Sequence, residues 1–264
     1  MASLEFIGTA TTLLRLGPFT LLTDPNFLHR GQRAYLGKGL FSKRLSEPSL
    51  QPGDLPDVDA VVLSHLHGDH FDRIARRELS RDLPIYTTGA ASRKLQKWGF
   101  AAAVPMTPWD VQTLHRDGSR LTITSIPGQH APGPVRHLLP PVMGSVLELE
   151  PGPHGGPFRV YVTGDTLYRP WLRQVTERQG PLDVMVAHLG GTRALGLLVT
   201  MDARQGAGLM RLLRPRVTVP VHFDDYTVFR SPLSDFLRIC AEENPDLEVT
   251  SVPRGQRADL IEET

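Results

Sequence analysis

Three histidines and an aspartate crowd into one short segment of the chain. The segment Ser64–His70 reads Ser-His-Leu-His-Gly-Asp-His, and it follows an apolar run that ends at Leu63. Neutral imidazole and carboxylate are suitable ligands for Zn, Mn, Fe and similar divalent ions. Gly68 permits the tight backbone that such convergence needs. Only ten histidines are spread over 264 residues, so this cluster favours a metal site over a polar turn that happens to be rich in histidine.

Three later segments share one pattern, in which an apolar strand-like run ends close to a residue able to bind a metal. The residues at these ends are His130, Asp165 and His222. Ligands from the ends of several strands can meet in one cleft. Singly, Asp165 has an alternative as a helix N-cap, and each histidine as a hydrogen-bonded core residue. Together the four segments supply seven ligands, enough for two metal ions: His65, His67, Asp69, His70, His130, Asp165 and His222.

This set of motifs resembles that of the metallo-β-lactamase-fold hydrolases, and the resemblance covers nearly the whole chain. Its centre is the pattern H-x-H-x-D-H, followed by a histidine, an aspartate and a histidine in the expected order. The resemblance implies an α/β fold, the four-layer αββα sandwich. It also implies that one metal takes His65, His67 and His130, that a second takes Asp69, His70 and His222, and that Asp165 bridges them.

Shorter motifs are similar to those of the branch that contains ascorbate-6-phosphate lactonase and N-acylphosphatidylethanolamine phospholipase D. They are Leu22–Pro25, Pro127–His130, Thr163–Thr166 and Pro220–His222, with Gly180–Asp183 and Met201–Asp202 similar to the phospholipase. Glyoxalase-II-like enzymes would carry G-H-T-x-G where this chain has Gly128–Pro132, which disfavours that branch. In the resembling branch Asp24 would orient a ligand imidazole, and its alternative is an Asp-Pro turn.

The expected cofactors are two divalent metal ions (Zn, Mn or Fe), which would hold a water between them and lower its pKa toward neutrality. The resulting hydroxide is the expected nucleophile. The catalytic candidates are therefore Asp165, which would bridge the ions, and Asp69, a candidate to relay a proton to the leaving group.

Substrate recognition is expected from loops at the strand ends. The long loop Asp24–Pro56 mixes basic and aromatic side chains, which suits an anionic group on a partly apolar molecule; a solvated basic surface loop is the alternative. The candidate substrate contacts are Arg44, His137, His188 and Tyr226, and a buried core histidine is an equal alternative for His188.

These residues predict a dinuclear metal-dependent hydrolase of a small anionic or ester substrate. A phosphodiester is the first expectation, and a lactone or carboxylic ester is the alternative. A di-iron oxidoreductase ranks below both, because a flavin domain does not fit in 264 residues. A binding protein with a non-catalytic metal site is disfavoured because all seven ligands are present. The balance of 29 basic and 28 acidic residues argues against a nucleic-acid partner.

The elements that must position these residues begin as a run of strands and then alternate between strand and helix, which suits layered sheets flanked by helices. No linker divides the chain, so one hydrolase domain over residues 1–264 is expected. The expected strands are Ser3–Gly8, Thr11–Leu16, Phe19–Thr23, Val58–Leu63, Pro84–Thr88, Ala101–Met106, Arg120–Ile126, Ser145–Leu149, Arg159–Thr163, Val184–His188 and Val217–Val221. The expected helices are Phe71–Ser80, Ala90–Trp98, Tyr168–Arg178, Asp202–Leu213 and Leu233–Glu243.

The composition sets the expected compartment. The single cysteine, Cys240, excludes an internal disulfide framework. No apolar run approaches the roughly 20 residues that span a bilayer, and Met1–Glu5 lacks the pattern of a signal peptide. A cytoplasmic protein is therefore expected, and its oligomeric state is left open.

Overall fold

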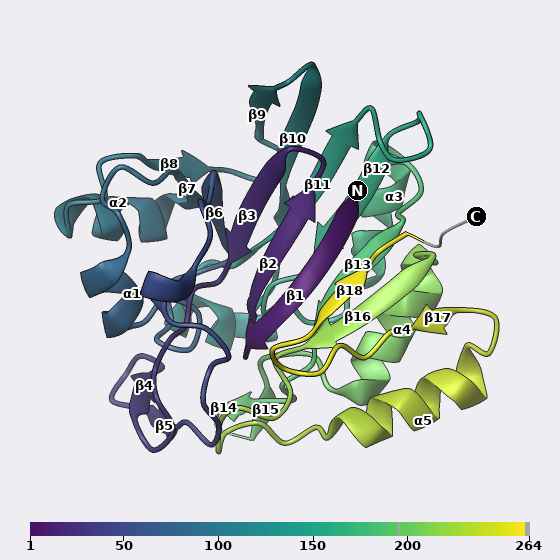
Figure 1. The fold of residues 1–264 in the computed structure, drawn as a ribbon. Helices are drawn as coiled ribbons and strands as arrows, with labels where there is room; N and C mark the ends of the chain where they lie inside the picture. Colours follow the sequence, from purple (N-terminus) through teal and green to yellow (C-terminus); the bar gives the residue numbers. More distant parts are fainter. Residues whose placement is uncertain (195, 262–264) are drawn as a thin grey trace.

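Two seven-stranded sheets form the centre of the computed structural model, which describes residues 1–194 and 196–261 (Figure 1). The strands of the first sheet are β1 (Ala2–Gly8), β2 (Thr11–Leu16), β3 (Phe19–Thr23), β6 (Ala60–Leu63), β7 (Ile85–Thr88), β8 (Ala103–Met106) and β18 (Arg257–Asp259). Their order across the sheet is β18-β1-β2-β3-β6-β7-β8. Strands β18, β1, β2 and β3 pair antiparallel, whereas β3, β6, β7 and β8 run parallel.

The second sheet repeats this division into an antiparallel and a parallel half. Its strands are β9 (Val111–Arg116), β10 (Ser119–Pro127), β11 (Met143–Glu150), β12 (Phe158–Val162), β13 (Val184–His188), β16 (Val217–Val221) and β17 (Glu248–Val249). Their order is β17-β16-β13-β12-β11-β10-β9. The pairs from β9 to β12 are antiparallel and those from β12 to β17 are parallel.

Helices cover the outer face of each sheet. Figure 1 shows α1 (Arg73–Glu78) and α2 (Gly89–Lys97) on the side of the molecule opposite to α3 (Gln174–Gln179), α4 (Ala203–Leu213) and α5 (Leu233–Glu243). The described residues also form three 3-10 segments: η1 (Pro52–Asp54), η2 (Gly133–Leu138) and η3 (Pro170–Arg173). The longest helices span 11 residues, and no helix in the described part of the chain has the length and apolar character to cross a membrane.

Alternation along the strands explains why the layers stack. Successive side chains of a strand point to opposite faces, so Val62 packs between the two sheets while its neighbour Val61 packs under the first sheet's helices. In β13, Val186 likewise faces the layer between the sheets, and Met185 faces α4 and α5. Three apolar layers result, and they confirm the predicted αββα sandwich.

Some expected elements differ from the observed ones. The helix predicted at Tyr168–Arg178 is split into η3 and α3, because Pro170 starts a separate turn. Strands β9, β17 and β18 were not predicted; β9 is mostly exposed, and the other two have only two or three residues. The expected loop Asp24–Pro56 contains a short hairpin, β4 (Arg33–Tyr35) with β5 (Phe41–Lys43), and a second hairpin joins β14 (Arg193–Ala194) to β15 (Leu197–Leu198).

Candidate metal centre

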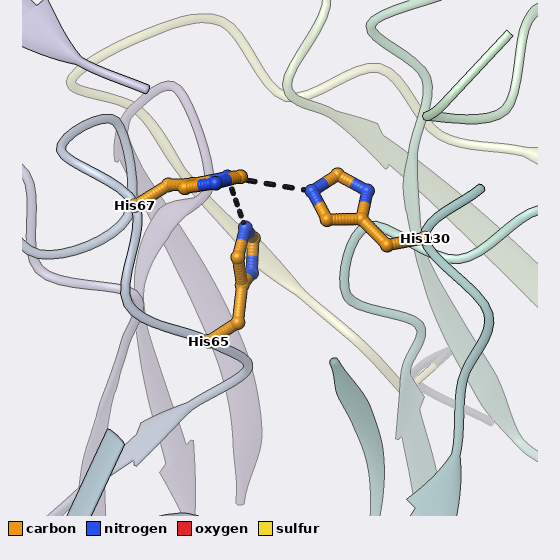
Figure 2. Close-up of side chains that lie close together, drawn as sticks. All are labelled: His65, His67 and His130. Atoms are coloured by element: carbon orange, nitrogen blue, oxygen red, sulfur yellow. Dashed lines mark hydrogen bonds between the residues drawn. The ribbon is translucent and has the colours of Figure 1, made fainter. Parts of the chain in front are cut away.

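The turn after β6 brings two of its histidines against a third histidine that follows β10. Nδ1 of His67 lies 2.9 Å from Nε2 of His65 and 3.3 Å from Nε2 of His130, and Figure 2 shows the three rings pointing toward one another. His130 donates from Nδ1 to the carbonyl oxygen of Val199 at 2.7 Å. That bond fixes the tautomer, so Nε2 of His130 presents a lone pair to the group.

A second group gathers beside the first. Asp69, His70 and His222 each place one donor atom within 4.8 Å of the other two, and Nε2 of His222 lies 3.5 Å from Oδ2 of Asp69. His222 has φ 63°, a conformation that is uncommon for a residue with a side chain. Its backbone N–H donates to the carbonyl oxygen of Thr9 at 2.6 Å, which ties the end of β16 to the turn after β1.

Asp165 lies between the two groups. Its Oδ2 is 3.4 Å from Nε2 of His70, and its Oδ1 is 3.6 Å from Nδ1 of His222. Asp165 also shares a cluster with His65 and His70, in which donor atoms lie within 4.8 Å of one another. Thr200 donates from its hydroxyl to Oδ2 at 3.0 Å. The chain therefore holds one carboxylate oxygen, while Oδ1 has no hydrogen-bond partner among the described residues.

The turn after β12 can place Asp165 only because residue 164 is glycine. Gly164 has φ +61°, and an added Cβ would lie 2.6 Å from the carbonyl oxygen of Met143 and 2.9 Å from Cβ of Ser64. Both the left-handed backbone and the close approach exclude a side chain. The segments after β6 and β12 therefore touch directly.

Asp24 stands behind the second group. Its Oδ1 accepts a bond from the backbone N–H of Ser64 at 2.7 Å. Its Oδ2 lies 3.2 Å from Nδ1 of His70 and 3.3 Å from Nε2 of His188. One carboxylate therefore positions both the start of the histidine turn and the His70 ring.

Burial and charge set the protonation of these groups. Burial lowers the pKa of His65 and His130, and it lowers that of His67 to about 3, which leaves these imidazoles neutral. Burial alone would raise the pKa of Asp69 and Asp165, but nearby imidazoles, His70 foremost for Asp69 and His222 foremost for Asp165, outweigh it and lower both values. His65, His67 and His130 are thus neutral and Asp69 and Asp165 are ionised, the forms that bind divalent cations.

The donor set fits divalent cations by a second observation. Within the described residues, Oδ1 of Asp69, Nε2 of His70, Oδ1 of Asp165 and Nε2 of His222 are buried without a hydrogen-bond partner. Buried polar atoms are normally paired, because leaving them unpaired costs free energy. A mixed nitrogen and oxygen donor set without sulfur suits Zn, Mn and Fe alike.

A cavity of about 140 Å³ opens onto this centre. His67, Asp69, His130 and Asp165 form its polar wall. The β4–β5 hairpin supplies an apolar wall of Leu36, Leu40 and Phe41, and the β14–β15 hairpin adds Arg193. The centre therefore faces a small space in which the candidate ligands lie opposite apolar side chains and one cation.

The four predicted substrate contacts do not gather in this cavity. Arg44 and Tyr226 are buried, and both bond to the side-chain oxygen of Asn26. Arg44 also pairs with Asp225 at 3.6 Å, so the expectation that Arg44 and Tyr226 contact substrate is corrected: they brace the loops behind the centre. His188 is buried against Asp24 and the Thr163 hydroxyl.

His137 is the exception, because it is exposed on η2. It lines a separate cavity of about 540 Å³ together with His130. His137 therefore remains a candidate for contact with a substrate that extends past the first histidine group.

Sequence reasoning gave no role to Ser64, Thr163 or Thr200. The hydroxyl of Ser64 lies 3.0 Å from Nδ1 of His65 and 3.3 Å from Nδ1 of His70. Ser64 and Thr163 adjoin the ligand motifs, so position next to a ligand at a strand end was an available signal. Thr200 precedes the Met201–Asp202 motif, and nothing in the sequence links it to Asp165, 35 residues away.

Comparisons with known proteins identify a family and similar folds. A family model described as "Beta-lactamase superfamily domain" matches residues 20–223. A curated metal-dependent hydrolase of Pyrococcus horikoshii is 24% identical over 263 residues, which cover 98% of this chain and 100% of the relative.

Two solved structures share the fold over their full length. A possible metal-dependent hydrolase from Veillonella parvula gives a TM-score of 0.83 at 22% identity, covering 98% of this chain and 99% of the other. An isothiocyanate hydrolase from Delia radicum gut bacteria gives a TM-score of 0.80 at 20% identity, covering 97% and 98%.

Proposed function

Because this chain belongs to the beta-lactamase superfamily, we propose that it is a metal-dependent hydrolase with two metal ions and that it cleaves an ester bond, a phosphodiester before a lactone or carboxylic ester. The observation that carries the proposal is the meeting of His65, His67 and His130 with Asp69, His70 and His222 at Asp165. The name of the Pyrococcus relative, a metal-dependent hydrolase, supports the same reaction type.

Different residues of the chain would orient the metal ligands and move a proton. Bound divalent ions would polarise the electrophile and lower the pKa of a water toward neutrality. Val199 and Asp24 fix the orientation of His130 and His70. Asp69 lines the cavity, and its Oδ1 has no hydrogen-bond partner among the residues described. We assign to that ionised oxygen the relay of a proton: it would accept the proton that the attacking water loses and pass it to the leaving group.

The cavity walls favour an ester with an anionic centre and an apolar substituent. Arg193 lies at the cavity edge, where a guanidinium can pair with a phosphate oxygen. Leu36, Leu40 and Phe41 offer an apolar surface to the substituent. A phosphodiester can contact both the cation and the apolar wall, whereas a neutral lactone offers no anionic oxygen to Arg193.

A substrate panel tests the reaction. The protein, loaded with Mn or Zn, is assayed with bis-p-nitrophenyl phosphate, a lactone, a p-nitrophenyl ester and an aryl isothiocyanate, the last because one structure of this fold is named an isothiocyanate hydrolase. Turnover of the phosphodiester above the others is expected. Turnover of the isothiocyanate alone, or oxygen consumption by iron-loaded protein without hydrolysis, would overturn the ester hydrolase proposal.

Ligand variants test the centre itself. His67→Ala and Asp165→Asn are expected to lower the metal content measured by ICP and to abolish hydrolysis while the far-UV CD spectrum is kept. His115→Ala is the matched control, because His115 is exposed on β9, outside the centre. Two metal ions per chain in both ligand variants would show that the assignment is wrong.

A further inference from the structure

A second cavity, of about 290 Å³, adjoins the metal centre and is lined by four basic side chains. We call it the basic cavity, and its cations are Arg33 on β4, Arg73 and Arg76 on α1, and Lys94 on α2. Three elements that are separate in the sequence therefore contribute positive charge to one concave site.

The charge in the basic cavity is not compensated by carboxylates. None of its four cations forms an ion pair with any residue that the structure describes, whereas the neighbouring Arg77 pairs with Glu78. Asp72 is the acidic residue on the wall, and its two oxygens accept four backbone N–H groups: those of Ile74 and Ala75 at 2.8 Å, of Phe27 at 2.5 Å and of Leu28 at 2.6 Å. Backbone donors therefore hold both oxygens of Asp72, and one carboxylate cannot balance four cations, so the cavity keeps a net positive charge that favours an external anion.

The four cations are exposed to solvent, but contacts with neighbouring residues restrain three of them. Arg73 and Arg76 are three residues apart on α1 and so lie on one face of the helix. The guanidinium carbon of Arg76 lies 4.2 Å from the centre of the Trp98 ring, and Nζ of Lys94 lies 5.1 Å from it. Arg73 donates to the carbonyl oxygen of Arg33 at 3.3 Å. Cations ordered in this way lose less side-chain entropy when they bind an anion.

The basic cavity adjoins the cavity of the metal centre, and two residues line both. His67 and Phe41 line both this cavity and the one that opens onto Asp165. On the hairpin side, Tyr35 and Phe41 are 50% and 61% exposed, with ring centroids 5.1 Å apart. A molecule with an apolar or aromatic body can therefore reach from one site to the other along this hairpin.

We propose that the basic cavity binds a phosphate or carboxylate group that the substrate carries in addition to the bond that is cleaved. The proposal rests on the proposed hydrolase function, because it places the cleaved bond at the metal centre. It narrows the substrate class to esters with a second, remote anionic group on an apolar body.

Binding is measured without turnover, through the fluorescence of Trp98. The metal-loaded protein is titrated with phenyl phosphate, inorganic phosphate and benzoate, and Trp98→Phe identifies the signal that belongs to this cavity. Arg73→Ala and, on the other helix, Lys94→Ala are each expected to raise the Kd of phenyl phosphate at least about tenfold, as loss of a charge-assisted bond predicts. Arg77→Ala, on the same helix but outside the cavity, is the matched control and is expected to change the Kd less than about twofold.

The variants distinguish a failure of this inference from a failure of the hydrolase proposal. Asp165→Asn is expected to abolish hydrolysis and to keep the Trp98 response to phenyl phosphate. A response lost in Asp165→Asn and unchanged in Arg73→Ala would place the anion at the metal centre and overturn the inference. The inference would also be overturned if Arg73→Ala and Lys94→Ala bound phenyl phosphate with the same Kd as the control Arg77→Ala. Tighter binding of benzoate than of phenyl phosphate would assign the cavity to carboxylates, and the reverse order to phosphates.

Discussion

Oδ2 of Asp24 lies 3.2 Å from Nδ1 of His70, although the two residues come from the ends of different strands, β3 and β6. The same carboxylate accepts the backbone N–H of Ser64 through its other oxygen. Burial raises the pKa of Asp24, but the charge of His70 and the hydrogen bonds of His188 and His70 outweigh burial and lower the pKa to about 2. An ionised carboxylate therefore orients the imidazole from behind, which leaves Nε2 of His70 facing the centre.

Asp24→Asn is expected to weaken metal binding about 10- to 100-fold, as loss of a bond to a ligand imidazole does elsewhere. The amide oxygen can still accept the Ser64 N–H, and Asn tolerates the left-handed backbone at φ 36°, so the fold is expected to persist. The measurement is the metal affinity from competition with a chelator, with His115→Ala as the control. An unchanged affinity would contradict the orienting role of Asp24.

Thr200→Val removes the donor to Oδ2 of Asp165 without changing the shape of the side chain. Loss of a bond to a buried charged group costs about 1–3 kcal/mol, so metal affinity is expected to fall at least about fivefold. Thr200→Ser keeps the hydroxyl and is expected to restore most of the affinity. If Val and Ser behave alike, the hydroxyl does not hold Asp165.

The metal-free protein is expected to lose stability as the pH falls below about 6.5. In the folded chain burial lowers the pKa of His65, His67 and His130, so the unfolded chain binds more protons in this range. Each such imidazole contributes a slope of about 1.4 kcal/mol per pH unit between its two pKa values, and for His67 that window runs from 6.5 down to about 3. Asp24 adds to the loss only below 3.8, as the pH falls toward its folded value of about 2.

The titration of His70 has the opposite effect on the stability of the metal-free protein. Burial lowers its pKa, but the charges of Asp165, Asp24 and Asp69 outweigh burial and raise it well above 6.5. Its contribution is present below pH 6.5 and is lost as the pH rises through the folded value. Urea denaturation of the metal-free protein between pH 4 and 9 should therefore show a stability maximum above pH 6.5. A stability that keeps rising as the pH falls from 7 to 4 would contradict the neutral state of the three histidines.

The local pattern of strands and helices predicted layered sheets flanked by helices, and the resemblance to the metallo-β-lactamase-fold hydrolases implied the αββα sandwich. The apolar run at β6 and the polar turn after it are adjacent in the sequence, and each parallel strand ends at the same edge of its sheet. His130, Asp165 and His222 each follow an apolar run, so each could be proposed as a ligand from the sequence, and the resemblance implied that they meet at one centre. The short strands β17 and β18 could not be predicted, because two or three residues are too few to show an alternating pattern.

Contacts between residues that are distant in the sequence could not be predicted from the sequence. Arg44 is basic and lies in a loop, which indicated an exposed substrate contact, yet its ion pair is with Asp225, 181 residues along the chain. Thr200 meets Asp165 only because the β14–β15 hairpin folds back over the centre. The basic cavity was equally hidden, because Arg33, Arg73 and Lys94 come from three elements that only the folded chain brings together.

Gly68→Ala tests whether the β4–β5 hairpin closes the cavity over the metal centre. The backbone N–H of Gly68 donates to the carbonyl oxygen of Tyr35 at 2.9 Å, and an added Cβ would lie 2.7 Å from the Tyr35 nitrogen and 2.8 Å from that oxygen. The hairpin must therefore move outward. Because Leu36, Leu40 and Phe41 would move with it, kcat/KM on the substrate identified by the panel is expected to fall at least about tenfold, the cost of misplacing a wall by about 1 Å. Overpacking is also expected to lower the free energy of unfolding by about 1–3 kcal/mol.

Gly53→Ala is the control, since a Cβ there meets nothing within 4 Å. Metal content should stay at the wild-type level in Gly68→Ala, because its change acts on the hairpin. Full activity in Gly68→Ala, with a loss of stability alone, would show that the hairpin is not part of the substrate site.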